Sequence, residues 1–218
     1  MNRKLKKYQA IGMKMNPKNK KEKGELMKEI LDEIWNGKDL PLYEERIKNK
    51  AYPVIGEGSH DAKIMFIGEA PGKNEAKTGR PFCGAAGKIL DGLLESVGLN
   101  REDVYITNIV KDRPPQNRDP LPDEITSYAP FLDRQIDIVK PRVIAALGRY
   151  SMTYILEKFN LWEEIQPISK IHGKIFDVKV SFGSVKIIPL YHPAASIYNR
   201  TTLDDLKKDF KILKKIVS

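Results

Sequence analysis

The sequence predicts an α/β fold in which a mainly parallel sheet is covered by helices on both faces. The first observation behind this prediction is that short apolar runs alternate with segments of helical periodicity along most of the chain. Strands that alternate with helices are joined by right-handed crossovers, which place helices over both faces of a parallel sheet. The second is the length of 218 residues, which suits one domain with a sizeable core, although length alone also permits two small ones.

The expected elements follow one another in a regular order. Ile30, Ile34 and Trp35 recur at helical spacing, and Gly37 ends this first helix. We then expect strands at 63–67, 103–107 and 143–147, a pair of strands across 174–190 that turns at Gly183, helices near 86–97, 123–138 and 149–158, and a closing helix over 201–217 capped by Thr201.

The first 24 residues differ from the rest of the chain in composition. They carry nine Lys and Arg side chains against one acid, Glu22, which gives a net charge of +8. A segment this basic and this poor in large apolar side chains buries too little surface to order itself firmly. We therefore expect a flexible basic arm over 1–24 and a single domain over 25–218. The arm is interpreted either as a DNA-seeking segment or as a solvated tail without a specific role.

The overall charge and the cysteine count restrict the possible functions. The formal charge is +9 and the pI about 9.4, which favours an anionic partner, most commonly nucleic acid, unless the chain simply comes from a lysine-rich proteome. Cys83 is the single cysteine, so one chain forms neither an internal disulfide nor an all-cysteine metal site. No apolar run approaches the roughly 20 residues of a membrane span, and no secretion signal is recognisable. We expect an intracellular, cytoplasmic protein without membrane contact.

Two loops that follow apolar strands carry the residues of greatest chemical interest. The first reads GEAPGKNEAKTGRPFCGAAGKIL over 68–90, and the second reads PLYHPAAS over 189–196. Glycine and proline at 68, 71 and 72 end the first strand and leave backbone N–H groups free. Because open α/β sheets bind ligands at the carboxyl ends of their strands, we expect the two loops to line one pocket.

Four separated blocks, in this order and spacing, resemble the family 4 uracil-DNA glycosylases. They are the loop at 68–90, VYITNIVKDRPPQNRDP at 104–120, VIAALGRYS at 143–151 and YHPAAS at 191–196. The resemblance covers roughly residues 37–213. It implies a three-layer α/β/α sandwich around a central, mainly parallel four-stranded sheet. It also implies a DNA repair enzyme that hydrolyses the N-glycosidic bond of uracil and leaves an abasic site, as in base excision repair.

The resemblance also assigns roles to the residues of a uracil pocket. Phe82 is expected to stack on the base, and Asn108 to accept from uracil N3–H and donate to O4. Glu75 is expected to crowd the position of the thymine methyl group. Taken singly, each of these side chains has an ordinary structural interpretation, as core, turn or helix cap; their joint occurrence favours a pocket.

The chemical step is assigned to His192, Glu69 and Asn108. His192 is expected to face O2 of the leaving uracil, where negative charge develops. Glu69 is expected to help position water or the loop, because Ala70 neither binds nor deprotonates water. The expected uracil-binding set is Gly68, Ala70, Glu75, Phe82, Asn108 and His192.

DNA contacts are expected from the loops around this pocket. The segment 192–200 is similar to the family loop that enters the minor groove, and Ile197 or Tyr198 is expected to fill the gap left by the flipped base. The glycines near 84–87 have helix initiation as an alternative interpretation. The expected DNA-binding set is Gly84, Gly87, Lys88, Arg149, Ser151, Ser196, Ile197, Tyr198 and Arg200.

The chain departs from the family at the iron–sulfur cluster. The four cysteine positions of the family align with Gly37, Leu40, Asp112 and Ala129, none of which is a thiol. Cluster ligation requires thiolates, so we predict that this chain has no cluster and no other metal or organic cofactor. Apolar packing around Leu40 and Leu42 is expected in its place.

The expected partner is uracil-containing DNA, single- or double-stranded, bound by a monomer in the nucleoid. Two alternatives to this assignment remain. In the first, the chain is a glycosylase specific for another deaminated base such as hypoxanthine. In the second, it is a catalytically silent domain that binds DNA or uracil. Cleavage of a uracil-containing oligonucleotide distinguishes the three.

Overall fold

Residues 19–217 are described in the computed structural model of the protein. Residues 1–18 of the predicted basic arm lie outside this range. Residues 20–24, the end of the predicted arm, form the beginning of helix α2 (Lys20–Trp35). The Asn19 side chain caps this helix by accepting the Glu22 N–H at 3.0 Å. Helix α2 buries Met27, Ile30 and Ile34, whereas Trp35 is 48% exposed.

A mixed and mostly parallel sheet forms the centre of the molecule. Its four inner strands, β3, β2, β4 and β6, are parallel, and the two edge strands pair antiparallel. The predicted number of four strands was wrong, because the sheet has six strands within residues 19–217. The extra edge strands arise from a two-residue pairing before β3 and from the hairpin that turns at Gly183. The strands in sheet order are β1 (Glu57–Gly58), β3 (Tyr105–Asn108), β2 (Ile64–Gly68), β4 (Val143–Leu147), β6 (Gly183–Leu190) and β5 (Phe176–Val180).

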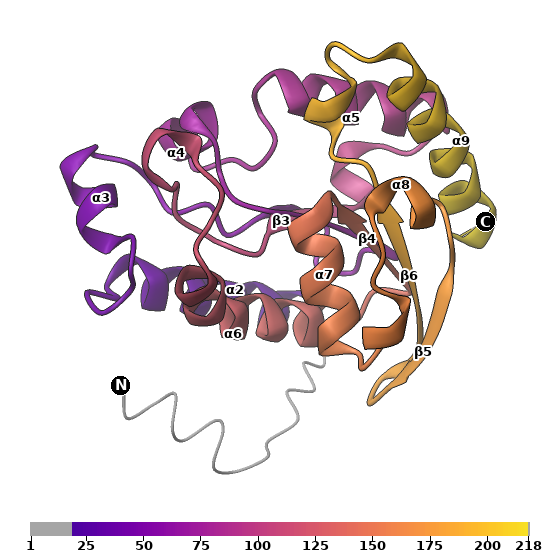
Figure 1. Cartoon of the computed structure of the whole chain (residues 1–218). Helices are drawn as coiled ribbons and strands as arrows, with labels where there is room; N and C mark the ends of the chain where they lie inside the picture. The colour runs from indigo at the N-terminus through magenta and orange to yellow at the C-terminus, as the bar shows by residue number, and fades with distance from the viewer. Residues whose placement is uncertain (1–18, 218) are drawn as a thin grey trace.

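Helices cover both faces of the sheet, as predicted. Along β2, Met65 and Ile67 pack with helices α2, α6 (Pro122–Val139) and α7 (Arg149–Lys158). Ile64 and Phe66 point the opposite way and pack with α5 (Ala85–Ser96) and α9 (Arg200–Val217). Because successive side chains of a strand point to opposite faces, one apolar strand supplies two cores. Figure 1 shows α2 and α6 on one side of the sheet and α5 and α9 on the other.

The remaining helices are short and lie in the connections. They were not predicted, because four to six residues carry too little periodicity to be recognised. Thr201 does not cap the last helix: α9 begins at Arg200, and Asn199 Oδ1 accepts the Thr202 N–H at 3.1 Å. None of the helices within residues 19–217 combines the length and the hydropathy that a membrane-spanning segment needs. The short helices are α3 (Tyr43–Lys48), α4 (Lys73–Thr78) and α8 (Ile168–Ile171).

The four parallel strands end at one edge of the sheet. Gly68 at the end of β2 is directly opposite Asn108 at the end of β3. On the other side of β2, β4 ends at Leu147, paired with Leu190 of β6, and His192 follows two residues later. The chain therefore delivers four loops to this edge, where ligands bind in open α/β sheets.

Candidate active site

The loops after β2, β3 and β6 enclose one cavity of about 380 Å³. The two loops that the sequence assigned to a common pocket do meet there. Of the predicted uracil-binding residues, Gly68 lies behind the wall and the other five line the cavity. Asn117 was missed, although it belongs to the PPQNR segment of the resemblance. The lining residues are Glu69, Ala70, Gly72, Glu75, Phe82, Ala86, Asn108, Asn117, His192 and Ala194.

Phe82 is held in the cavity wall in an unusual backbone conformation. Its φ is 45°, a left-handed value that non-glycine residues rarely adopt, and its side chain is almost completely buried. The ring lies over Gly68, where a Cβ atom would come within 2.7 Å of it. A Cβ atom at Gly87 would collide with the Phe82 carbonyl. Both glycines are therefore required so that the strained phenylalanine can reach the pocket.

Glu75 fixes this turn from the side of α4. Its Oε1 accepts the N–H groups of Cys83 and Gly84, both at 2.9 Å. Each of these is a charge-assisted hydrogen bond to the residues that directly follow Phe82. Glu75 thus both lines the cavity and holds the aromatic wall in place. Its second role was not predicted from the sequence.

Asn108 presents a free amide to the cavity. It is the last residue of β3 and is 2% exposed, and its side chain makes no hydrogen bond to any of the described residues. The amide atoms are not among the fully buried side-chain atoms without a partner, so the amide opens onto the cavity. The donor and the acceptor of Asn108 therefore remain available to the edge of a bound base.

A buried lysine supports Asn108 from behind. Lys111 is fully buried, and its Nζ donates to the Asn108 carbonyl at 2.6 Å, to Gln135 Oε1 at 2.6 Å and to Thr107 Oγ1 at 2.8 Å. Burial lowers the pKa of Lys111 well below its usual value, and Asp133 opposes this effect. All three hydrogen bonds of Nζ are made with neutral oxygens. The burial of Lys111 could not be predicted from the sequence, because lysine is rarely buried and nothing in its neighbourhood marks it as internal.

His192 stands on the other side of the cavity as a neutral imidazole. Its ring centroid is 5.5 Å from that of Phe82, with the rings inclined by 30°. Burial lowers the pKa of His192 to about 4, against a smaller raising effect of the Glu75 charge. The Nδ1 atom accepts the Ala194 N–H at 3.2 Å, so in the neutral ring the proton is on Nε2. His192 can therefore donate a hydrogen bond into the cavity without carrying a charge.

Glu69 titrates near neutrality. Burial raises its pKa to about 7, Asp119 adds to the increase, and Arg149 opposes it. A carboxyl group with this pKa exists in both protonation states at physiological pH, a property typical of acid–base and water-positioning groups. Ala70 beside it contributes only a methyl group to the wall.

The residues predicted to contact DNA differ in exposure and in hydrogen bonding, and none of them is in the cavity lining. Lys88, Arg149 and Arg200 are exposed, and Ile197 and Tyr198 are 39% and 97% exposed. The polar groups of three others already make hydrogen bonds within the protein. The Gly84 N–H donates to Glu75, the Ser151 hydroxyl donates to the Gly148 carbonyl, and the Ser196 hydroxyl donates to the Pro193 carbonyl. Gly87 packs against Phe82, as described above. The DNA contacts of the whole set stay predictions.

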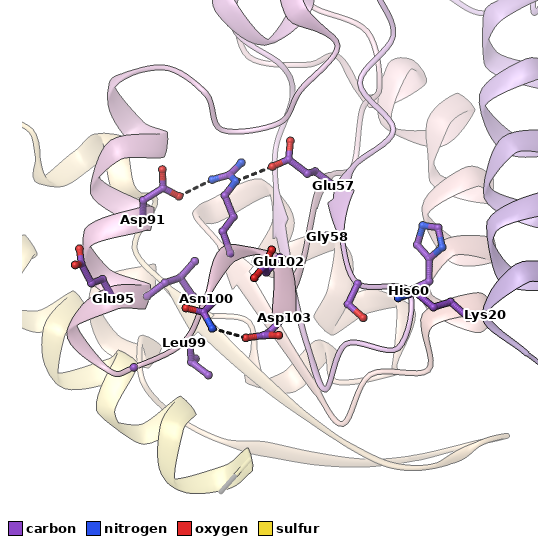
Figure 2. Close-up of a pocket in the computed structure, with 14 residues that line it drawn as sticks. Lys20, Glu57, Gly58, His60, Asp91, Glu95, Leu99, Asn100, Glu102 and Asp103 are labelled. Atoms are coloured by element: carbon purple, nitrogen blue, oxygen red, sulfur yellow. Dashed lines mark hydrogen bonds and ion pairs between the residues drawn. The ribbon is translucent and has the colours of Figure 1, made fainter.

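A larger hollow of about 1010 Å³ lies at the opposite edge of the sheet, near the amino end of β3 (Figure 2). Its wall carries five carboxylates, which would repel DNA phosphates. Arg101 neutralises two of them, Glu57 at 2.9 Å and Asp91 at 2.7 Å. No group of three or more potential metal ligands occurs in the described part of the chain. The smaller cavity, with its free amide, aromatic wall and neutral imidazole, is therefore the candidate active site.

Fold and site together define a nucleobase-binding α/β enzyme, and residues 55–215 match the uracil DNA glycosylase superfamily. The chain is 46% identical over 191 residues to a type-4 uracil-DNA glycosylase of Sulfurisphaera tokodaii, covering 87% of this chain and 84% of that protein. It is 43% identical over 187 residues to the type-4 uracil-DNA glycosylase of Archaeoglobus fulgidus, covering 86% and 91%. A type-5 uracil-DNA glycosylase of Thermus thermophilus is 32% identical over 157 residues. The chain belongs to the type-4 uracil-DNA glycosylases.

The residues present do not fit the iron–sulfur cluster of this family. A four-cysteine cluster needs four thiolates, and the sequence has one cysteine, Cys83. The resemblance described above would place the ligands at Gly37, Leu40, Asp112 and Ala129, none of which is a thiol. Asp112 is buried in an ion pair with Arg46. Leu42 lies in the apolar core and Leu40 packs against it, as expected, whereas the buried ion pair beside them was not predicted.

Proposed function

We propose that this enzyme hydrolyses the N-glycosidic bond of uracil in DNA and leaves an abasic site, a step of base excision repair. The observation that carries the proposal is the convergence of Phe82, Asn108 and His192 on one cavity. A glycosylase cannot reach a base inside a duplex, so it turns the nucleotide out of the helix and reads it in such a pocket.

Base recognition follows from the polarity of the pocket. The flipped uracil stacks on Phe82, and the Asn108 amide accepts from N3–H and donates to O4. Cytosine presents the opposite polarity at these two atoms, so it would leave buried groups of Asn108 unpaired. Lys111 keeps the Asn108 backbone in position. Glu75, tied to the turn after Phe82, stands where the methyl group of thymine would have to fit.

In the chemical step, the bond between C1′ and N1 breaks and its electron pair leaves with uracil. The negative charge spreads to O2, where the Nε2–H of His192 donates a hydrogen bond. A positioned donor stabilises this developing charge best where water is excluded. Water then adds to C1′ of the sugar, and its proton passes to Glu69 or to solvent. Glu69 orients this water, since Ala70 offers no polar atom. The reaction uses no metal or organic cofactor.

The DNA is bound by a single chain, because all the residues of the proposed site come from one domain, residues 25–218. Lys88, Arg149 and Arg200 bind phosphates, while Gly84, Gly87, Ser151 and Ser196 shape the loops that approach the backbone. Ile197 and Tyr198 enter the gap left by the base. The basic segment 1–24 adds sequence-independent attraction to single- or double-stranded DNA.

An oligonucleotide with a single uracil tests the proposal. After incubation and alkali, we expect strand scission at the uracil. If scission occurred only in a matched oligonucleotide that carries hypoxanthine in place of uracil, the substrate would be another deaminated base. Retention of DNA without scission would indicate a silent binding domain. Chelators should have no effect on the reaction.

The role of His192 is tested by His192→Ala. We expect the single-turnover rate to fall about 10²- to 10³-fold, as for other removed donors at a developing oxyanion. DNA affinity should change little. If affinity collapsed while the cleavage rate of bound DNA persisted, the assigned role would be wrong.

A further inference from the structure

A buried ion pair lies outside the uracil pocket. Arg46 on α3 and Asp112 after β3 are 4% and 1% exposed, and Arg46 Nη1 contacts Asp112 Oδ2 at 2.7 Å. The Tyr128 hydroxyl of α6 donates to the same oxygen at 2.6 Å. Arg46 Nη2 donates to the carbonyls of Ile34 and Trp35 at 3.0 and 2.9 Å. We call Arg46, Asp112, Tyr128 and these two carbonyls the Arg46 network.

The Arg46 network joins four segments that are distant in sequence. They are the end of α2, helix α3, the loop after β3, and α6. Helix α3 has six residues, all described, and Arg46 is the only one of them that is buried. A helix this short is not stable by itself, so its position depends on the side chain that docks it. Arg46 therefore fixes α3 to the body of the protein.

The four positions at which the resemblance would place the cluster ligands, Gly37, Leu40, Asp112 and Ala129, lie in or next to the same segments. Asp112 is one of these positions. Gly37 lies two residues after Trp35, and the Leu40 N–H donates to the Gly37 carbonyl at 3.1 Å. Ala129 directly follows Tyr128. The Arg46 network thus connects the segments that a cluster would have to connect.

A buried ion pair between Arg46 and Asp112 is not the arrangement expected from stability alone. Removing two charges from water is costly, and apolar side chains of similar volume would often be at least as stable. Asp112 Oδ1 has no hydrogen-bond partner among the described residues, so Oδ2 alone accepts both Arg46 and Tyr128. Directional bonds of this kind fix the relative position of the segments, which apolar contacts do less sharply.

We propose that the Arg46 network takes the place of the iron–sulfur cluster and positions the loop from Ile109 to Leu121 beside the active site. This loop begins immediately after Asn108, and it carries Asn117 into the wall of the cavity. Arg46 and Asp112 are then positioning residues that act on the pocket through this loop. The effect on cleavage rests on the proposed function, whereas the effect on the loop does not.

Arg46→Met tests the proposal, with Lys48→Met as the matched control on an exposed position of the same helix. Loss of one partner leaves Asp112 buried without its counter-charge, and we expect Tm to fall by roughly 10 °C. Hydrogen exchange should accelerate at least tenfold in α3 and in 109–121, with the sheet strands unchanged. Unchanged exchange in these two segments, or equal acceleration throughout the sheet, would overturn the proposal.

Two further variants keep the test decisive. If Arg46→Met does not fold, Tyr128→Phe removes a single bond to Asp112 and should accelerate exchange in the same segments by a smaller factor. At a temperature where the variant is folded, we expect single-turnover cleavage at uracil to fall at least tenfold without loss of DNA affinity, and Arg46→Lys to recover part of it. If the wild type did not cleave uracil, the exchange result would still decide the structural claim.

Introducing four cysteines tests the equivalence of network and cluster. The variant combines Gly37→Cys, Leu40→Cys, Asp112→Cys, Ala129→Cys and Arg46→Met. After anaerobic reconstitution with iron and sulfide, we expect absorption near 400 nm on the order of that of a four-cysteine cluster and recovery of slow exchange in 109–121. Absorption without recovery in this loop would contradict the idea that network and cluster perform the same task.

Discussion

At the scale of single residues, the site consists of side chains whose environment is unusual for their type. Asn108 presents an amide without protein partners to the cavity, Lys111 is fully buried among neutral oxygens, and His192 is an imidazole whose pKa is lowered by burial. Removing the lysine and the imidazole from water costs stability in the free protein. Such costs concentrate at functional sites, where a ligand or a reaction uses the group.

Asn108→Asp tests the reading of the base. The carboxylate accepts from N3–H but cannot donate to O4, so we expect uracil excision to slow by about 10- to 100-fold. The measurement is the single-turnover rate on a uracil oligonucleotide. Asn160→Asp, at an exposed position, is the control. An unchanged rate in Asn108→Asp would refute the assigned role.

The raised pKa of Glu69 predicts how the cleavage rate depends on pH. Its pKa is raised to about 7, so the carboxylate that orients water forms as the pH passes through neutrality, and the cleavage rate should rise there. Protonation of His192, with a pKa of about 4, should not interfere above pH 5. Single-turnover rates between pH 5.5 and 8.5 measure this rise of the cleavage rate with pH. Glu69→Gln should abolish the rise. If the rise persisted in this variant, another group would be responsible for it.

Glu69 and His192 make the free energy of unfolding depend on pH with opposite signs. The folded-state pKa of Glu69 lies above its ordinary value of 4.5, so folding favours the protonated form, and its contribution is lost as the pH rises towards 7. The folded-state pKa of His192 lies below its ordinary value of 6.5, so its contribution is lost as the pH falls from about 6.5 towards 4.

At the scale of elements, the turn from β2 to α5 depends on close backbone contacts. The strained Phe82 packs between Gly68 and Gly87, and Glu75 holds the following N–H groups. Helix α5 contains a second glycine, Gly92, around which a Cβ atom would meet nothing within 4 Å. The helix therefore offers a matched pair of substitutions.

Gly87→Ala should destabilise the protein by about 1–3 kcal/mol, because its Cβ atom collides with the Phe82 carbonyl and the backbone must move. Gly92→Ala should stabilise it by about 0.5–1 kcal/mol through the better helix propensity of alanine. Denaturant unfolding measures both. If the two variants were equally stable, the close packing at Gly87 would not be essential.

The sequence predicted the elements that carry strong periodicity and the site they bring together. Asn108 ends one parallel strand, and Phe82 and His192 lie in loops after two others; the carboxyl ends of such strands share an edge of the sheet. Strand β1 has two residues and helix α3 has six, too few for a pattern. The burial of Lys111 and Arg46 was not predictable either, because both side-chain types usually reach solvent and their partners are far away in sequence.

At the scale of the whole molecule, the distribution of acidic and exposed apolar side chains favours DNA at the carboxyl ends of the strands. The chain carries a net charge of +9, of which residues 1–24 supply +8, and the hollow with five carboxylates lies near the amino end of β3, away from the uracil cavity. The loop with Ile197 and Tyr198 projects beside the cavity with large apolar side chains in solvent. An exposed apolar tip on a basic protein is typical of a wedge that enters DNA.

Tyr198→Ala tests this wedge. The gap left by a flipped base exists only in a duplex, so we expect excision from double-stranded DNA to slow at least several-fold more than excision from single-stranded DNA. Parallel rate measurements on the two substrates give this ratio, and Ile197→Ala extends them to the neighbouring residue. Equal slowing on both substrates would assign Tyr198 to general DNA contact instead.

The Arg46 network has a consequence for the cell that makes this protein. A metal cluster must be assembled by dedicated machinery, and oxidants or a shortage of iron can take it away. Guanidinium, carboxylate and phenol groups come with the polypeptide itself. Genome maintenance by this chain would then need no delivery of iron or sulfide and would not depend on a group that oxidants can remove.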